Sequence, residues 1–450
     1  MAKFILMSKL NRYRYCGSAV LIVAIAGILS SLANAGDRPK FPPANFANAP
    51  RANVALGQLL FYDKILSGNR NIACATCHHP KFGTSDGVSL ALGEGATGLG
   101  TARRVDPEAV PEQRVGRNAP ALFNLGAAEF TSLFHDGRLE RDAGGAGGLR
   151  TPLAAEMAEK FNNVLSAQAM FPVLSGDEMA GQYSENDVSK AVRKGLLAQT
   201  GGAWDIIALR VDEIPEYRRA FDGAIGKRPV KFTDIANMIA DFIAFEWRAD
   251  QSPFDRYLAG GTLSVDAAKG LDLFYGKAGC ATCHAGRFQT DHGFHAIAMP
   301  QIGPGKSARF EGHNRDIGRM RVTGDPSDIY RFRTPSLRNI TATAPYGHDG
   351  AYATLEAVLR HHLDPVNALY SYDRTQAVLP ALSGAQDWAI LEDANEMARI
   401  AQANELAPIG LEDHEIKALL TFLQALTDDV SLVGRMGVPN TVPSGLPVSD

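Results

Sequence analysis

The stretch Cys74-Ala75-Thr76-Cys77-His78 occurs a second time, unchanged, as Cys280-Ala281-Thr282-Cys283-His284. The spacing C-x-x-C-H is the attachment pattern of c-type haem, in which the two thiols bond to the haem vinyl groups and the histidine is an iron ligand. A zinc half-site would need further Cys or His residues at short spacing, and a thioredoxin-like redox pair does not need the histidine. The sequence therefore predicts two covalently bound haem c groups.

The fifth cysteine, Cys16, lies in a segment with the pattern of a secretory signal peptide. Residues 1–15 carry four basic and no acidic side chains, an apolar run follows over 19–32, and Ala33-Asn34-Ala35 is a cleavage pattern. The apolar run is short for a membrane span, although an uncleaved anchor is the alternative. We expect residues 1–35 to be removed on export to the periplasm, leaving no membrane span.

The charge balance argues against a nucleic-acid partner. The net charge of the 450-residue chain is −4, and it becomes −8 when the four basic residues of the signal segment are removed. A diffuse acidic surface is compatible with a basic electron-transfer partner. The mature chain is long enough for two or three domains.

Whole blocks of sequence repeat in the same order in the two halves of the chain. Such blocks at long spacing indicate a duplicated domain rather than a short-period solenoid. The matching pairs are Gly57–Lys64 with Gly270–Lys277, the two C-x-x-C-H motifs, Arg117–Pro120 with Arg333–Pro335, and His135–Gly137 with His348–Gly350.

Helix patterns occupy corresponding places in the two halves. A periodic apolar stretch follows N-cap candidates at 263–266 and leads to Cys280, and residues 411–427 have one apolar helical face. In the first half, residues 232–248 have the pattern of the equivalent helix, and strand signals are few. The predicted fold is mainly α, with two cytochrome-c-like haem domains and long loops, arising from an internal duplication.

Linker composition sets the expected domain boundaries. Residues 251–262 contain Pro and Gly-Gly and are typical of a domain junction. We therefore place an N-terminal haem domain at residues 40–258 and a C-terminal haem domain at 262–430. Residues 436–450 are expected to form a loose tail.

The sequence resembles the bacterial di-haem cytochrome c peroxidases, a superfamily that includes MauG. The resemblance covers roughly residues 50–430. It implies an N-terminal peroxidatic haem and a C-terminal haem that collects electrons from a donor. It rests on five motifs together: Arg117–Pro120, Phe134–Arg138, Ser252–Tyr257, Arg333–Asn339 and Thr343–Gly350.

The resemblance assigns the catalytic carboxylate to Glu178. Cleavage of hydrogen peroxide needs a base that moves a proton from one oxygen to the leaving oxygen. In the family this base is the glutamate of a Gln-Ala-x-x-Pro-x-x-x-x-x-Glu-Met string, which residues 168–179 match at every spacing. The other Glu-Met pair, Glu156-Met157, lacks the Gln-Ala. We predict Glu178 as the base, with Gln168 as a second polar group; surface acids on helices are the alternative.

The expected iron ligands differ between the two haems. His78 and His284 are the proximal ligands. In the family the second haem has a sixth ligand, usually methionine, fourteen residues after the position of His348, and here that residue is His362. A nitrogen ligand favours ferric iron and lowers the haem potential. His361 is the alternative if the register slips by one, and a histidine pair that binds no iron is another.

Two further departures from the family pattern concern the first haem and the gap between the haems. Classical members carry a histidine that blocks the first iron, but no histidine lies between His79 and Arg117. The segment Gly93–Gly100 instead suggests a flexible loop, so we predict an iron with an open distal face at rest. The family's inter-haem tryptophan is replaced by His135.

The resemblance also implies a calcium ion between the domains, held through Asn118, Thr343 and Pro345 because oxygen donors suit this ion. The alternative is that Asn118 is an ordinary turn residue beside Pro120.

The leading functional hypothesis is a periplasmic enzyme that reduces hydrogen peroxide to water with electrons from a small c-type cytochrome or a cupredoxin. One alternative is a MauG-like oxidase that modifies a partner protein through a high-valent di-haem state. Another is a di-haem electron-transfer protein without enzymatic activity. Whether the protein forms a homodimer is left open.

Overall fold

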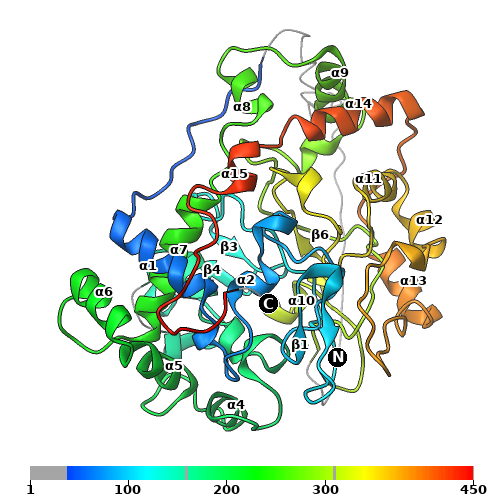
Figure 1. Cartoon of the computed structure of the whole chain (residues 1–450). Coiled ribbons are helices and arrows are strands. Elements are labelled where there is room, and N and C mark those ends of the chain that lie inside the picture. The colour runs from blue at the N-terminus through cyan, green and yellow to red at the C-terminus, as the bar shows by residue number, and fades with distance from the viewer. Residues whose placement is uncertain (1–37, 158–160, 308–310, 449–450) are drawn as a thin grey trace, which may run out of the picture.

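The computed structural model describes residues 38–157, 161–307 and 311–448, so the predicted signal peptide lies outside the described residues. Helices and long loops make up most of this part of the chain, and its strands, each two or three residues long, form three small antiparallel sheets. The expectation of a mainly α fold is confirmed (Figure 1). No helix of the described residues is long and apolar enough to cross a membrane.

The elements follow one another along the chain as alternating clusters of helices and short strands. Their bounds are α1 Arg51–Tyr62, α2 Cys74–Cys77, β1 Ala96–Thr97, β2 Arg104–Val105, β3 Ser132–Leu133, β4 Leu139–Arg141, β5 Leu149–Arg150, α3 Val164–Gln168, α4 Asp187–Arg193, α5 Ala203–Asp212, α6 Pro215–Ile225, α7 Phe232–Glu246, α8 Pro253–Leu258, α9 Val265–Tyr275, β6 Phe294–His295, α10 Met320–Thr323, β7 Phe332–Arg333, α11 Leu355–Leu363, α12 Pro365–Tyr370, α13 Ala394–Gln402, α14 Asp413–Gln424 and α15 Asp429–Val433.

Two closely packed helix pairs, α1 with α7 and α9 with α14, form the framework of the two halves. A Cβ atom added to Gly57 of α1 would lie 1.9 Å from the carbonyl oxygen of Met238. One added to Gly270 of α9 would lie 2.0 Å from the carbonyl oxygen of Ala418. Both repeated Gly-x-x-x-Phe blocks therefore contain a glycine because only glycine allows the partner helix so close.

The predicted helices of the second half are confirmed. Ser264 is the N-cap of α9, and its hydroxyl accepts a hydrogen bond from the backbone N–H of Ala267 at 3.2 Å. The apolar face of α14 is buried, with Leu419 and Phe422 at most 1 % exposed. Helix α9 leads directly to the haem motif because it ends a few residues before Cys280, and α14 packs against α9.

Helix α8 lies within the predicted domain junction, residues 251–262. Phe254 on α8 is fully buried in one core cluster with Phe274 of α9 and Phe422 of α14. The helix therefore packs as part of the C-terminal half, because its aromatic side chain completes the α9–α14 core.

The prediction of a loose tail is wrong for residues 436–448. Val442 is buried in the large core of the N-terminal half, and the Ser444 hydroxyl donates to the buried carboxylate of Asp63 at 2.6 Å. The carboxylate of Glu246 accepts the backbone N–H groups of Arg435, Met436 and Gly437 at 2.7–2.9 Å. These contacts bring the C-terminal segment back onto α1 and α7, as the dark red trace in Figure 1 shows.

The expected flexible loop at Gly93–Gly100 is instead an ordered, largely buried segment. The Arg103 guanidinium donates to the carbonyl oxygens of Gly93 and Gly98 at 2.6 and 2.8 Å. Glu94 is 1 % exposed and accepts hydrogen bonds from the side-chain amides of Asn69 and Asn71. Side chains that are distant in sequence therefore fix a stretch whose glycines suggested freedom.

Candidate haem-binding active site

The second C-x-x-C-H motif lies at a cavity of about 510 Å³. This volume is in the usual range for small-molecule and cofactor sites. The His284 ring lines the cavity, and its Nδ1 is 3.0 Å from the carbonyl oxygen of Gln289. Because Nδ1 donates to this carbonyl, Nε2 is left without a proton, as an imidazole that binds a metal requires.

His362, on α11, faces His284 across the same cavity. The two ring centroids are 6.5 Å apart, and two imidazoles that bind one metal from opposite sides, with bonds of about 2 Å, would have centroids about 6 Å apart. The Nδ1 of His362 donates to the carbonyl oxygen of Val358 at 2.7 Å, so its Nε2 is also left for a ligand. The donor set therefore fits a haem iron with two axial nitrogens.

His361 has a different environment. Its Nδ1 is 2.9 Å from the Tyr352 hydroxyl and its Nε2 is 2.8 Å from the carbonyl oxygen of Ile297, so both ring nitrogens have protein partners. Burial, followed by the nearby charge of His362, lowers the pKa of His361 to about 3. The geometry brings His362, not His361, to His284.

The first C-x-x-C-H motif lies at a separate, smaller cavity. Cys74 and Cys77 are on α2, and the Nδ1 of His78 donates to the carbonyl oxygen of Thr84 at 3.0 Å. Burial lowers the pKa of His78, and the hydrogen bond with Thr84 partly opposes this effect. The proximal side of this cavity is therefore built like that of the second one.

Gln168 and Glu178 are the predicted polar groups that reach the first cavity. Gln168 ends α3, and its Oε1 is buried without a hydrogen-bond partner among the described residues. Glu178 lies in a single wide helical turn, Gly176–Ala180. Glu156, the glutamate of the other Glu-Met pair, is exposed and does not line this cavity.

Lys306 is a residue of this cavity that the sequence motifs did not indicate. Its Nζ is 3.9 Å from Oε1 of Glu178, although the two residues come from different halves of the chain. Burial lowers the pKa of Lys306, and the charge of Glu178 opposes this effect. No repeated block contains Lys306, so only the tertiary structure could reveal it.

His135 lies between the two sites, because it lines both cavities. Burial, followed by the positive charge of Arg117, lowers the pKa of His135 well below its ordinary value, so the ring is neutral. Arg117 itself pairs with Asp136 and Asp316, each at 2.7 Å. This buried ion network joins the two halves directly beside His135.

Arg333 lacks a carboxylate partner, although it is enclosed between the halves. Its guanidinium donates to the carbonyl oxygens of Phe134 and Thr334, and no ion pair with an acid is present among the described residues. Burial lowers its pKa to about 10. A half-buried cation of this kind fits the propionate of a haem in the cavity it lines.

The three residues expected to hold calcium, Asn118, Thr343 and Pro345, all line the second cavity. The side-chain amide of Asn118 donates to the carbonyl oxygen of Val88 at 2.9 Å. Its nitrogen therefore also has a structural role, and its oxygen is the atom that a cation would use.

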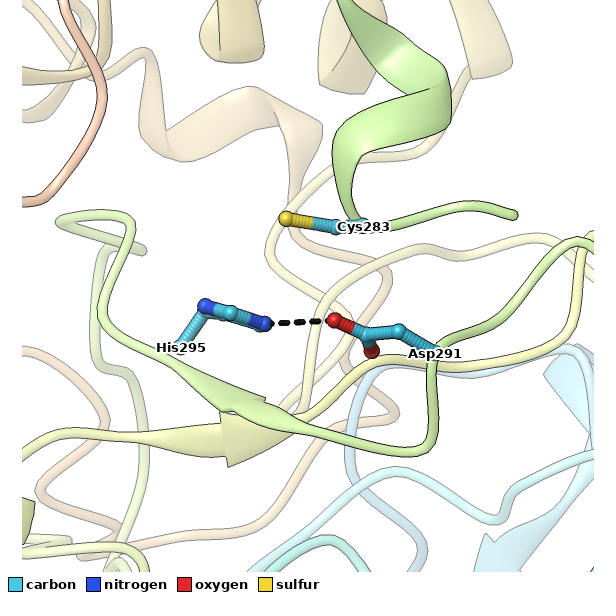
Figure 2. A group of neighbouring side chains, drawn as sticks. All are labelled: Cys283, Asp291 and His295. Carbon is cyan, nitrogen blue, oxygen red and sulfur yellow. Dashed lines mark hydrogen bonds and ion pairs between the residues drawn. The ribbon is translucent and has the colours of Figure 1, made fainter. Parts of the chain in front are cut away.

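Figure 2 shows Cys283, Asp291 and His295, whose possible ligand atoms lie within 4.8 Å of one another. His295 Nε2 is 2.9 Å from the Asp291 carboxylate, and its Nδ1 is 3.1 Å from that of Glu405. A thioether bond to haem would remove the thiolate of Cys283 as a metal ligand. The group is therefore part of the second haem environment rather than a separate metal centre.

Comparison with known proteins identifies the family. The family model of the di-haem cytochrome c peroxidases matches residues 51–262. The cytochrome c551 peroxidase of Pseudomonas aeruginosa is 31% identical over 66% of this chain and 67% of the relative. The chain belongs to the di-haem cytochrome c peroxidase family.

Other members of this family are also similar. The methylamine utilization protein MauG of Methylorubrum extorquens is 29% identical over 77% of this chain and 82% of that protein. A crystal structure of a MauG-like protein associated with microbial copper homeostasis has a TM-score of 0.58 and 25% identity, and the match covers 88% of this chain and 96% of that one. This di-haem peroxidase is therefore an oxidoreductase with two haem c groups, and its family implies a peroxide substrate and a redox partner.

Proposed function

We propose that the protein reduces hydrogen peroxide to water in the periplasm, using electrons from a small c-type cytochrome or a cupredoxin. The observation that carries this proposal is the first cavity, in which Glu178 and Gln168 lie in the same enclosure as His78. An iron ligand on one side and a carboxylate with an amide on the other are the groups that peroxide cleavage requires.

In this proposal Cys74, Cys77 and His78 hold the peroxidatic haem, which supplies the redox chemistry when bound. The Glu178 carboxylate takes the proton from one oxygen of hydrogen peroxide and returns it to the oxygen that leaves as water. The side-chain oxygen of Gln168 has no hydrogen-bond partner among the described residues, and it accepts a hydrogen bond from the bound peroxide. One peroxide, two electrons and two protons give two water molecules.

Cys280 and Cys283 would hold the second haem, and His284 and His362 are the side chains that would bind its iron. The position of His135 at both cavities makes this residue the proposed link between the haems. The packing of Gly57 and Gly270 in equivalent helix pairs supports an origin of the two halves by internal duplication.

A MauG-like oxidase that modifies a partner protein is the second candidate. The His284–His362 pair favours it, because two nitrogen ligands lower the haem potential and make the haem a poorer acceptor of electrons from a donor. His135 and Ala278 weigh against it, since the family resemblance places tryptophans at both positions in MauG.

Two accessory features belong to the proposal. A calcium ion is held by Asn118, Thr343 and Pro345 at the edge of the second cavity. Residues 1–35 are removed on export, and sequencing the N-terminus of the exported protein tests this step, with Gly36 expected as the first residue.

The test is the steady-state rate of peroxide reduction with a reduced small cytochrome c. Replacing Glu178→Gln should lower the rate by about 10²–10⁴-fold, because the base is lost while the shape is kept. Glu156→Gln, the other Glu-Met pair, is the matched control and should retain the wild-type rate.

An unchanged rate in Glu178→Gln would contradict the assignment of the base. Slow turnover with a long-lived two-electron-oxidised form of the wild type would favour the MauG-like candidate instead. A ferric protein that does not react with peroxide at all would leave only electron transfer.

A further inference from the structure

Lys306 places a positive charge in the first cavity from the opposite half of the chain. It lines the cavity together with His78 and Glu178, and its Nζ is 3.9 Å from Oε1 of Glu178. Among the ion pairs of the described residues, this is the contact that Glu178 makes with a cation. The pair therefore connects the C-terminal half to the group proposed as the base.

The backbone around Lys306 is fixed by contacts with other segments. The carbonyl oxygen of Gly305 packs so closely on Gly116 that a Cβ atom added there would lie 2.0 Å from it. The backbone N–H of Gly303 donates to the carbonyl oxygen of Asp387 at 2.9 Å, and the Ser307 hydroxyl donates to that of His313 at 2.7 Å. These contacts fix the position at which the Lys306 side chain enters the cavity.

The other charged groups near this pair have partners of their own. Arg138 pairs with Asp136 at 3.0 Å, and Arg117 is shared between Asp136 and Asp316. The Asp177 carboxylate, next to Glu178, accepts a hydrogen bond from the Gln113 amide at 2.7 Å. The charge of Arg138 also acts on Glu178, but among the ion pairs of the described residues it is Lys306 that lies 3.9 Å from the Glu178 carboxylate.

We propose that Lys306 is a positioning residue, whose ammonium group holds the Glu178 carboxylate turned into the first cavity. The inference rests on the proposed function, because it assumes that Glu178 is the base. A carboxylate held by an opposite charge at 3.9 Å is already oriented when it must take a proton, and orientation of a catalytic group lowers the barrier of the step.

The direction of the effect follows from this arrangement. Without the ammonium group of Lys306, the Glu178 carboxylate is free to turn away from the cavity. A step in which Glu178 takes a proton should therefore become slower in a Lys306 variant.

The experiment measures the rate at which cyanide binds to the ferric holoprotein, followed by the change in haem absorption at pH 7. Hydrogen cyanide is neutral and must give its proton to a base when it binds iron as the anion, so its association rate reports on Glu178 without turnover. The variants are Lys306→Met, Lys306→Arg, Glu178→Gln and the double variant. Lys269→Met, at a lysine paired with Asp266 on the surface, is the matched control.

Lys306→Met should lower the association rate by about 10-fold, because the base is no longer oriented. Lys306→Arg should restore most of the wild-type rate, and Lys269→Met should match the wild type. In the Glu178→Gln background, Lys306→Met should cause no further loss, because Lys306 acts through Glu178.

A wild-type rate in Lys306→Met together with a reduced rate in Glu178→Gln overturns the role of Lys306 alone. A wild-type rate in Glu178→Gln overturns Glu178 as the base, and with it the proposed function. Haem content and the far-ultraviolet circular dichroism of each variant show whether it folds. If Lys306→Met does not fold, a wild-type rate in Lys306→Gln overturns the role of Lys306.

Discussion

The two haem motifs are identical in sequence, yet their cavities are different. On the proximal side they are alike, because His78 and His284 each donate from Nδ1 to a backbone carbonyl five or six residues further on. On the far side, Glu178 and Gln168 reach the first cavity, whereas His362 faces the second. The attachment motif thus decides where a haem is bonded, and remote segments decide what it can do.

Each site is completed by residues of the other half. The second cavity is lined by α11 and α14, and also by Asn118, Phe134 and His135 of the N-terminal half. The first cavity takes Lys306 from the C-terminal half, and the C-terminal segment packs back onto the N-terminal core. The N-terminal half therefore depends on the rest of the chain for both its site and its stability.

The largest expected effect comes from removing the ligand that distinguishes the second site. In His362→Ala the second haem should lose its low-spin character, because the nitrogen opposite His284 is gone. Electron paramagnetic resonance of the ferric protein should then show both haems as high-spin. The reaction of the first haem with peroxide should persist.

His361→Ala is the matched control for this prediction. It should keep the low-spin signal but lower the free energy of unfolding by about 1–3 kcal/mol, because Tyr352 and the carbonyl oxygen of Ile297 lose their buried partner. Loss of the low-spin signal in this variant, or its retention in His362→Ala, would reverse the ligand assignment.

A medium effect is expected where the C-terminal segment braces the N-terminal half. Glu246→Gln replaces a carboxylate that accepts three backbone N–H groups, so one of its two acceptor atoms becomes a donor. The free energy of unfolding should fall by about 1–3 kcal/mol, and the segment should become easier to cleave with protease.

The control for this prediction is Glu216→Gln, which changes an exposed glutamate on α6. Its effect on chemical denaturation should stay within about 0.5 kcal/mol. Equal denaturation curves for Glu246→Gln and the wild type would mean that the C-terminal segment contributes nothing to stability.

The smallest effect is expected for calcium. Adding the ion should raise the thermal unfolding temperature of the chelator-treated holoprotein by a few degrees. Asn118→Ala should abolish the increase, and Asn118→Asp, which keeps an oxygen donor, should preserve most of it. A wild-type protein that unfolds at the same temperature with calcium and with chelator would refute this site.

Sequence patterns predicted the elements that obey local rules. Ser264 caps α9 as its side chain suggested, and the apolar periodicity of residues 232–248 and 411–427 gave α7 and α14 within a few residues. The sequence pattern did not predict the packing of the C-terminal segment, because its partners Asp63 and Glu246 are far away in sequence. The glycines of residues 93–100 suggested a flexible loop, but hydrogen bonds from the side chains of Arg103, Asn69 and Asn71 fix that segment.

The sequence by itself determined the mainly helical fold, and it predicted the two haem attachment sites and the candidates for the base. These follow from short motifs whose chemistry depends on local spacing. Only the tertiary structure distinguished His362 from His361, because the choice depends on which ring nitrogens already have partners. It alone brought Lys306 to Glu178, since a contact between the two halves depends on packing that no local pattern encodes.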